Sequence, residues 1–342
     1  MTTTSRIAVW DLLKLLAIFL VVWGHCMQYL LPATIEDNPL FLWICSFHMP
    51  LFMVLSGLFA EKSFARTWQD YFIRRSIQLL IPWISWTTII ILVIFLLDSN
   101  FNEIKNFIIN SLWFLKSLFI CGLLALIGFK MKGNRIFWIV ASFVISQLFL
   151  VWEVFKMYPC FLFGILCART MKHITKWSKP IALITGLFFI ALSVLAAHSS
   201  SFWMRNLGIR ELLFNGGLSI TNNLDFLIAL ITKRYAQILL GCIGALFFIS
   251  LFILLFRENQ NKYIPRLSIF GQYTLGVYVI QTLIVETVLP HFLSIDIEYA
   301  FLFNYLIAPA LSFTIVGTCL YINLFIENKS KYVTLFLFGK RK

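Results

Sequence analysis

One apolar segment near the N-terminus carries three ionisable residues that a helix would place on one face. Lys14 and His25 are eleven residues apart. At about 100° per residue they return to within about 20° of each other, roughly 16 Å apart along the helix axis. Asp11 lies three residues before Lys14, within reach of an ion pair. Because an ionisable group in an apolar span is costly unless it is paired or lines a wet cavity, these residues are the first functional candidates.

Polar residues on other apolar segments fall at a depth similar to that of His25. Counted from the predicted outer ends at about 1.5 Å per residue, His25 lies about 9 Å deep, His48 about 12 Å, Lys116 about 8 Å and Gln281 about 12 Å. Three further residues border this layer, namely Ser46, Ser56 and Glu286. A histidine near neutral pH can accept a proton from a hydroxyl group, so the layer suits acid–base chemistry.

A second polar set, mostly cationic, gathers at the inner ends of the segments. It consists of Lys14, Arg74, Arg75, Gln78 and Gln272. Guanidinium and ammonium groups bind phosphate, so this set suits a phosphate-bearing acyl donor such as coenzyme A. From spacing alone, acyl transfer to a hydroxyl group and ion-coupled transport are about equally favoured.

The composition indicates that a membrane surrounds these residues. The chain has 342 residues, of which 60% are hydrophobic and only 13% charged. Its mean hydropathy is +0.87, and these values exclude a water-soluble globule. The apolar runs are continuous rather than alternating, which excludes a porin-type barrel. The sequence therefore predicts an all-α, polytopic integral membrane protein.

Nine apolar runs are long enough to span a bilayer. They lie near 7–31, 40–60, 76–97, 111–129, 136–152, 180–197, 236–256, 267–289 and 300–326. A tenth run, near 154–168, is short and contains Pro159, but it keeps the flanking basic loops on one side of the membrane. We therefore expect about ten transmembrane helices, in a single membrane domain that comprises residues 1–342.

The net charge of +13 is concentrated in the loops between these runs. Most lysines and arginines fall in segments on the same side as the N-terminus, so the positive-inside rule predicts that both termini are cytoplasmic. A multi-pass protein of a bacterial-type inner (plasma) membrane is expected, with the lipid bilayer as a partner. No nucleic-acid partner is predicted, because the charge follows the loops.

Five motifs together resemble the membrane-bound acyltransferase-3 family. They are DLLKLLAIFLVVWGH at 11–25, SFHMPLFMVLSG at 46–57, RRSIQLLIPW at 74–83, LWFLK at 112–116 and LSIFGQYTLGVY at 267–278. The motifs cover the first 120 residues well and 267–281 again. Between these regions only the span count and the length agree with the family.

The resemblance implies about ten spans and the transfer of an acetyl group from cytoplasmic acetyl-CoA to a sugar hydroxyl group outside the membrane. Lys14 and His25 match the family's motif of a basic residue, a ten-residue spacer and a histidine, which implies that His25 is the catalytic base. Arg75 matches the basic residue that contacts the donor. Within the family the chain resembles the stand-alone sugar O-acetyltransferases, such as fucose O-acetylases, since we expect no secreted esterase-like domain to follow.

The sequence departs from the family pattern at two positions. Gln78 stands where many relatives have a second arginine, so part of the donor site is neutral, and Arg74 is the residue expected to compensate. Gln281 stands where many relatives have a histidine, which implies a different acceptor specificity or, if that histidine were catalytic, a change in activity.

The candidate site residues fall into three groups. The catalytic residue is His25, the residues that bind the acyl donor are Lys14, Arg75 and Arg74, and those that shape the site or hold the acceptor are Asp11, His48, Lys116, Trp113 and Gln281. Simpler roles compete with some of these. Lys14 could only neutralise Asp11, Trp113 also suits an interfacial belt, and His48 could bond a backbone carbonyl group that Pro50 leaves without a donor.

The expected partners are acetyl-CoA as the donor substrate and a glycan or lipid-linked sugar as the acceptor. We expect no permanently bound cofactor and no metal. Two other functions stay open at this point. One is a proton-coupled secondary transporter in which Asp11, Lys14 and His25 relay protons, and the other is an inert homologue that binds or flips a lipid-linked glycan.

Overall fold

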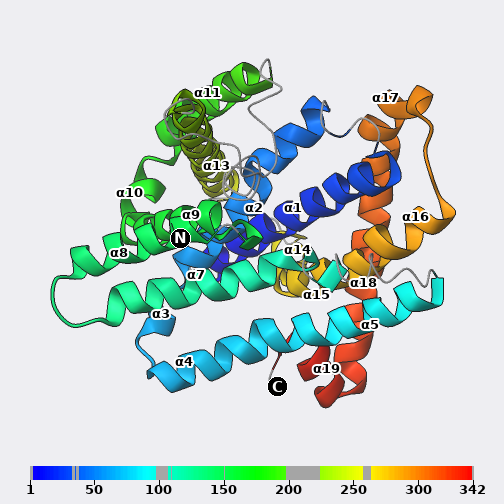
Figure 1. The fold of residues 1–342 in the computed structure, drawn as a ribbon, viewed down its shortest axis with the longest axis horizontal. Helices are drawn as coiled ribbons and strands as arrows, with labels where there is room; N and C mark the ends of the chain where they lie inside the picture. The colour runs from blue at the N-terminus through cyan, green and yellow to red at the C-terminus, as the bar shows by residue number, and fades with distance from the viewer. Residues whose placement is uncertain are drawn as a thin grey trace.

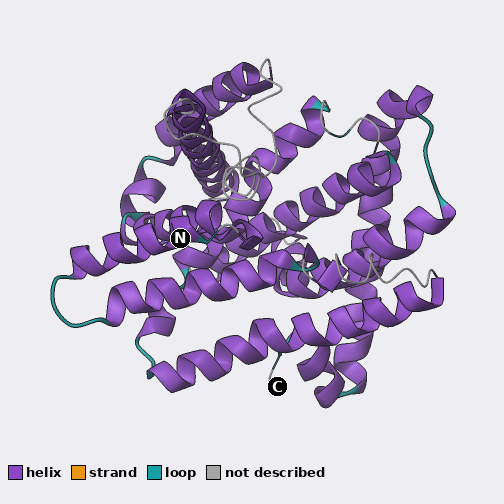
Figure 2. Cartoon of the chain, in the orientation of Figure 1, coloured by secondary structure: helices purple, strands orange, loops and turns teal. Residues whose placement is uncertain are grey.

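The computed structural model describes residues 3–32, 35, 38–97, 107–108, 110–149, 151–197, 224–256 and 263–340. Within these ranges all regular structure is helical and no strand occurs (Figure 2). Nine helices in the described part are long and apolar enough to cross a membrane. They are Ala8–Leu30, Pro39–Leu58, Trp68–Leu97, Trp113–Lys130, Val151–Arg169, Ser178–Ala196, Ile231–Phe256, Arg266–Phe292 and Ile297–Lys329. The prediction of an all-α, polytopic membrane protein is confirmed.

Two of the predicted spans differ from the observed helices. The run expected at 136–152 forms an apolar helix, Ile136–Leu148, which is shorter than each of the nine candidate spans. The short run with Pro159 instead belongs to a candidate span of 19 residues, Val151–Arg169. Neighbouring helices and local adjustments allow a proline inside a membrane helix, so Pro159 does not end this one.

The described residues of the first half of the chain form ten helical elements. In order they are α1 (Thr3–Leu30), α2 (Pro39–Leu58), α3 (Glu61–Phe64), α4 (Trp68–Arg75), the π-helical turn η2 (Ser76–Leu80), α5 (Ile81–Leu97), α7 (Trp113–Lys130), α8 (Arg135–Leu148), the 3₁₀ turn η3 (Val151–Glu153) and α9 (Val154–Arg169). Helix α2 has regular N-terminal capping, because the side chain of Asn38 accepts hydrogen bonds from the backbone N–H groups of Leu40 and Phe41.

The second half continues as helices interrupted by π-helical and 3₁₀ turns. The elements are α10 (Met171–Lys176), α11 (Ser178–Ala197), α13 (Leu224–Phe256), α14 (Tyr263–Ser268), η6 (Ile269–Tyr273), α15 (Thr274–Gln281), the π-helical turn η7 (Thr282–Val288), α16 (Leu289–Phe292), η8 (Ile297–Tyr299), α17 (Ala300–Leu302), the π-helical turn η9 (Phe303–Ile307), α18 (Ala308–Lys329) and α19 (Lys331–Phe338). Helix α13 begins well before 236, where the predicted span starts.

Helix α1 runs through the middle of the bundle (Figure 1) and contacts α2, α13, α15 and α18. Close packing around it depends on glycine. A Cβ atom at Gly271 would overlap the backbone of Asp11, and Cβ atoms at Gly57 and Gly164 would overlap the backbones of α9 and α2 respectively. Glycine at these positions lets the helices approach backbone to backbone, as it commonly does in membranes.

Several basic turns meet at one end of the bundle, on the left of Figure 1, which we call the inner end. It is formed by α3, the turn between α7 and α8, and α10. Arg169 at the end of α9 forms an ion pair with Glu61 of α3, and Lys130 at the end of α7 donates a hydrogen bond to the carbonyl oxygen of Arg66. Segments that the positive-inside count assigns to one side of the membrane are therefore neighbours in space.

Candidate active site

The inner part of the α1 face carries the predicted pair of Asp11 and Lys14. The Lys14 Nζ atom lies 2.9 Å from Asp11 Oδ1, as the spacing of three residues allows. The Lys14 side chain is 30% exposed, whereas that of Asp11 is 8% exposed. Lys14 Nζ also lies 5.8 Å from the centre of the Phe59 ring. The ammonium group therefore has access to the inner end while its carboxylate partner is held inside.

At the far end of the same face, His25 contacts two oxygen acceptors through one ring nitrogen. Its Nδ1 atom lies 2.9 Å from Glu286 Oε1 and 3.1 Å from Gln281 Oε1. Carboxylate and amide oxygens accept hydrogen bonds and cannot donate them, so Nδ1 carries the proton. The other nitrogen, Nε2, is then the site at which a neutral ring can accept a proton. The His25 side chain is 21% exposed, so the ring is not sealed in the apolar core.

Glu286 is fixed by several donors besides His25. Its Oε1 atom lies 3.0 Å from the hydroxyl oxygen of Thr282 and 3.2 Å from Nε2 of Gln281. The hydroxyl group of Tyr29 donates to Oε2 over 3.1 Å. A carboxylate held from several directions has little freedom to rotate, so it fixes the orientation of the imidazole.

The contact between Gln281 and Glu286 depends on the π-helical turn η7. In a regular α-helix, residues five apart differ by about 140° around the axis and do not face the same neighbour. A π-helical turn pairs residue i with residue i+5, and such turns are frequent at functional sites. The hydroxyl group of Thr287 also donates to the carbonyl oxygen of Thr282, five residues earlier. The widened turn thus brings both side chains to His25.

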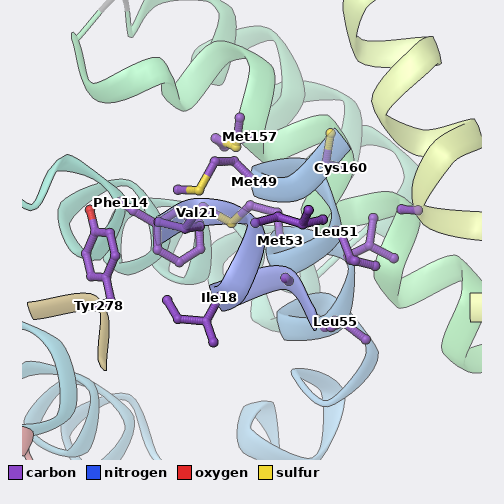
Figure 3. Close-up of a cluster of buried hydrophobic side chains, with 14 of the residues drawn as sticks. Ile18, Val21, Met49, Leu51, Met53, Leu55, Phe114, Met157, Cys160 and Tyr278 are labelled. Atoms are coloured by element: carbon purple, nitrogen blue, oxygen red, sulfur yellow. The ribbon is translucent and has the colours of Figure 1, made fainter. Parts of the chain in front are cut away.

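Two apolar residues, Ile18 and Val21, lie on α1 between its cation and its imidazole. Figure 3 shows them in a buried cluster with Met49, Met53 and Met157. Methionine side chains are unbranched and flexible, so they adapt to irregular spaces more easily than other apolar residues. The space between the two polar ends of the α1 face is therefore filled by buried apolar side chains, of which the methionines can adopt other conformations.

The structure separates the two arginines that the sequence paired. Arg74 Nε donates to Asp70 Oδ1 over 2.7 Å on the exposed side of α4. Arg75 instead lies over the ring of buried Tyr71, with its Cζ atom 5.6 Å from the ring centre. Gln78 is exposed. Arg75 is therefore the arginine directed toward the bundle.

Lys116 lies in an aromatic setting on α7. It is 3% exposed, and its Nζ atom is 5.3 Å from the ring centre of Trp83 and 4.9 Å from that of Trp152. Trp152 has a left-handed backbone, with φ of 55°, which is unusual for a bulky residue and turns the indole from the start of α9 toward α7. Phe114, two residues before Lys116, packs edge to face on Tyr278.

Trp113 and His48 are placed outside the immediate contacts of His25. The ring of Trp113, at the first residue of α7, packs edge to face on Phe114 with ring centres 6.0 Å apart. His48 is buried, and its Nδ1 atom lies 2.7 Å from the carbonyl oxygen of Ile44, one turn earlier in α2. Pro50 removes the donor for the carbonyl group of Ser46, so the bond to Ile44 is not the one expected from the proline.

Some contacts of the site were predicted from the sequence, and others were not. The spacing on α1 predicted the ion pair of Asp11 with Lys14, which is present, and the depth count put Gln281 in the same layer as His25, where the two side chains are in contact. Glu286 was predicted from the sequence only to border this layer. Tyr29 and Thr282 were missed, since a tyrosine and a threonine in an apolar run give no signal of their own.

The chain matches a family model described as "Acyltransferase domain" over residues 7–324. Among characterised proteins, it is 29% identical over 213 residues to nodulation protein NolL of Mesorhizobium japonicum, covering 57% of this chain and 56% of that protein. It is 28% identical over 191 residues to nodulation protein NolL of Sinorhizobium fredii, covering 49% and 50%. The chain thus spans about half the length of these relatives. No solved structure matches the chain significantly.

Proposed function

Because the chain belongs to the acyltransferase family whose model covers residues 7–324, we propose that it is a membrane O-acyltransferase. In this proposal it moves an acetyl group from cytoplasmic acetyl-CoA to a hydroxyl group of an extracytoplasmic glycan or lipid-linked sugar. The observation that carries the proposal is the imidazole of His25, oriented through Nδ1 by a buried carboxylate and partly exposed.

The arrangement of His25 supports a role at Nε2. Glu286 and Gln281 both engage Nδ1, which leaves the lone pair of a neutral ring on Nε2. A carboxylate that holds an imidazole in one tautomer, and stabilises the imidazolium once it forms, is the arrangement by which a histidine acts as general base in acyl transfer. Glu286 is the positioning residue in this mechanism.

The chemical step follows from that orientation. Nε2 accepts the proton of the acceptor hydroxyl group while the hydroxyl oxygen bonds to the thioester carbonyl carbon. The carbon–sulfur bond then breaks, and the departing thiolate takes the proton from the imidazolium, which yields free coenzyme A and an ester. If Nε2 attacks the thioester itself, an acyl-histidine forms first, and the same nitrogen must again be unprotonated.

The donor would enter from the inner end of the α1 face. Lys14 and Arg75 supply positive charge there, which suits the phosphate groups of coenzyme A. The methionine cluster beside Ile18 and Val21 is the part of the packing that can yield to a thin thioester arm on its way to His25.

The acceptor would bind near Lys116. An ammonium group between two indole rings offers hydrogen-bond donors and flat apolar faces, both of which suit a sugar ring. On the same helix, Phe114 packs on Tyr278, whose backbone carbonyl oxygen accepts a hydrogen bond from Gln281 Nε2.

The proposal is tested with inverted membrane vesicles that contain the protein and receive radiolabelled acetyl-CoA. We expect label in the extracted glycan and lipid-linked sugar fraction, and a loss of about 10²- to 10⁴-fold in His25→Ala, as for removal of a general base. His291→Ala, an exposed histidine on α16, serves as the control and should retain full activity. Proton-driven solute uptake without any transfer of label would instead support a transporter.

A further inference from the structure

A hollow of about 440 Å³ opens at the inner end of the bundle. Its walls come from α3 and from the last turns of α7 and α9, which meet at the left of Figure 1. The lining residues are Glu61, Phe64, Ala65, Phe129, Lys130 and Arg169. The size lies within the range of about 300–1,000 Å³ that is common for small-molecule sites.

Two cations line this hollow, and both can exchange their present partners at low cost. Nε of Arg169 donates to Glu61 Oε1 over 2.7 Å, and the two side chains are 44% and 37% exposed. An ion pair this exposed contributes little to stability. Lys130 donates one hydrogen bond to the carbonyl oxygen of Arg66, and an ammonium group has three donors. A phosphate group suits both cations better than these partners do.

Aromatic rings form a row from the hollow toward the donor-binding arginine. Arg169 Cζ lies 5.3 Å from the centre of the Phe129 ring, and Phe129 stacks on Phe64 with ring centres 5.4 Å apart. The Phe64 ring is 5.9 Å from that of Tyr71, over which Arg75 lies. A ligand that combines a flat ring with phosphate groups matches this sequence of aromatic and cationic groups.

The hollow is also close to Lys14. The ring beneath Lys14 Nζ belongs to Phe59, the C-terminal capping residue of α2, and only Ala60 separates it from Glu61 in the wall of the hollow. Arg75, through the aromatic row, and Lys14, through Phe59, are therefore each connected to residues in the wall of the hollow.

We infer that the hollow holds the nucleotide end of the acyl-CoA donor, an inference that rests on the proposed function. Arg169 and Lys130 bind phosphate of the phosphorylated adenosine, and the adenine ring packs against Phe129, which is more exposed than Phe64. The flexible arm then leaves toward Lys14 and enters the α1 face. An anionic phospholipid headgroup shares the phosphate chemistry, but it has no flat ring to match the aromatic row.

Equilibrium dialysis of purified protein with radiolabelled coenzyme A tests the assignment. We expect Arg169→Ala and Lys130→Ala each to raise the Kd for coenzyme A by about tenfold, as for loss of a charge-assisted hydrogen bond. Lys62→Ala, an exposed neighbour of Glu61 that does not line the hollow, should leave the Kd unchanged. Glu61→Gln removes the carboxylate that competes for Arg169, so it should lower the Kd, a gain that misfolding cannot produce.

The truncated donor acetyl-pantetheine separates this inference from the proposed function. The Arg169 and Lys130 variants should raise KM for acetyl-CoA and leave KM for acetyl-pantetheine unchanged, because the shorter donor has no nucleotide. If wild-type protein uses acetyl-CoA but the variants bind it normally, the nucleotide assignment is overturned while the acyltransferase proposal stands. If Arg169→Ala releases phosphatidylglycerol in native mass spectrometry with an unchanged Kd for coenzyme A, the hollow is a lipid site. If wild-type protein does not bind coenzyme A at all, both proposals fail.

Discussion

Replacing Glu286 with glutamine tests whether the carboxylate orients the imidazole of His25 for the proposed catalysis. The substitution keeps the size of the side chain, and an amide oxygen in the place of Oε2 can still accept a hydrogen bond from the hydroxyl group of Tyr29. What it removes is the negative charge 2.9 Å from His25 Nδ1. It also introduces an amide N–H group that favours the wrong tautomer, in which Nδ1 accepts and Nε2 carries the proton.

The expected loss can be worked from the contact itself. A hydrogen bond to a charged group contributes about 1.5–3 kcal/mol, and the Glu286 side chain is only 12% exposed, so solvent weakens the interaction little. Since about 1.4 kcal/mol corresponds to a factor of ten in rate, kcat should fall about 10- to 100-fold. Gln281 Oε1 still accepts from Nδ1 at 3.1 Å, which favours the lower part of that range.

The assay compares kcat and KM for acetyl-CoA, measured by release of the coenzyme A thiol in the presence of membrane glycan fractions. Glu286→Gln should lower kcat with KM for acetyl-CoA unchanged, because Lys14, which we propose to bind the donor, lies toward the other end of α1. Glu298→Gln, an exposed glutamate on η8, is the matched control. A folded Glu286→Gln protein with wild-type kcat would refute the positioning role.

Two further substitutions address the donor cation and the helix packing. Lys14→Met should raise KM for acetyl-CoA by about tenfold, and it should lower Tm because it leaves Asp11 buried without its partner. Adding Asp11→Asn should restore Tm but not KM. Restoration of both Tm and KM would contradict a role of Lys14 in donor binding. Gly164→Ala should destabilise the protein by about 1–3 kcal/mol, because the new Cβ atom would overlap the carbonyl oxygen of Val54. A fluorescence melt in detergent measures this against Gly317→Ala, where a Cβ atom meets nothing within 4 Å, and equal Tm values for the two variants would contradict the packing argument.

On α1, helical periodicity alone was enough to predict which ionisable residues share a face. The spacing of Asp11, Lys14 and His25 depends only on the angle per residue of a regular helix, and the ion pair of the first two is present as expected. The fold class was equally accessible, because continuous apolar runs leave a membrane protein few structures other than helices.

Contacts that depend on an irregular backbone, or on several helix ends coming together, could not be predicted from the sequence. Glu286 reaches His25 through a π-helical turn, and an α-helical period turns it away from Gln281. The left-handed conformation of Trp152 brings its indole to Lys116, although nothing in the sequence around 152 indicates such a backbone. The hollow lined by Lys130 and Arg169 is formed by helix ends that are far apart in the chain. From the sequence, these two residues could therefore be used only to predict the orientation of the chain in the membrane.

The most direct test of the central claim is the mass of the surface glycan and lipid-linked sugars in cells whose own copy is replaced by the wild-type or the His25→Ala chain. If the imidazole of His25 performs acyl transfer, the wild-type cells carry species heavier by one acetyl group, and the His25→Ala cells lack them although the protein is present in the membrane. Full acetylation in the His25→Ala cells would contradict the account.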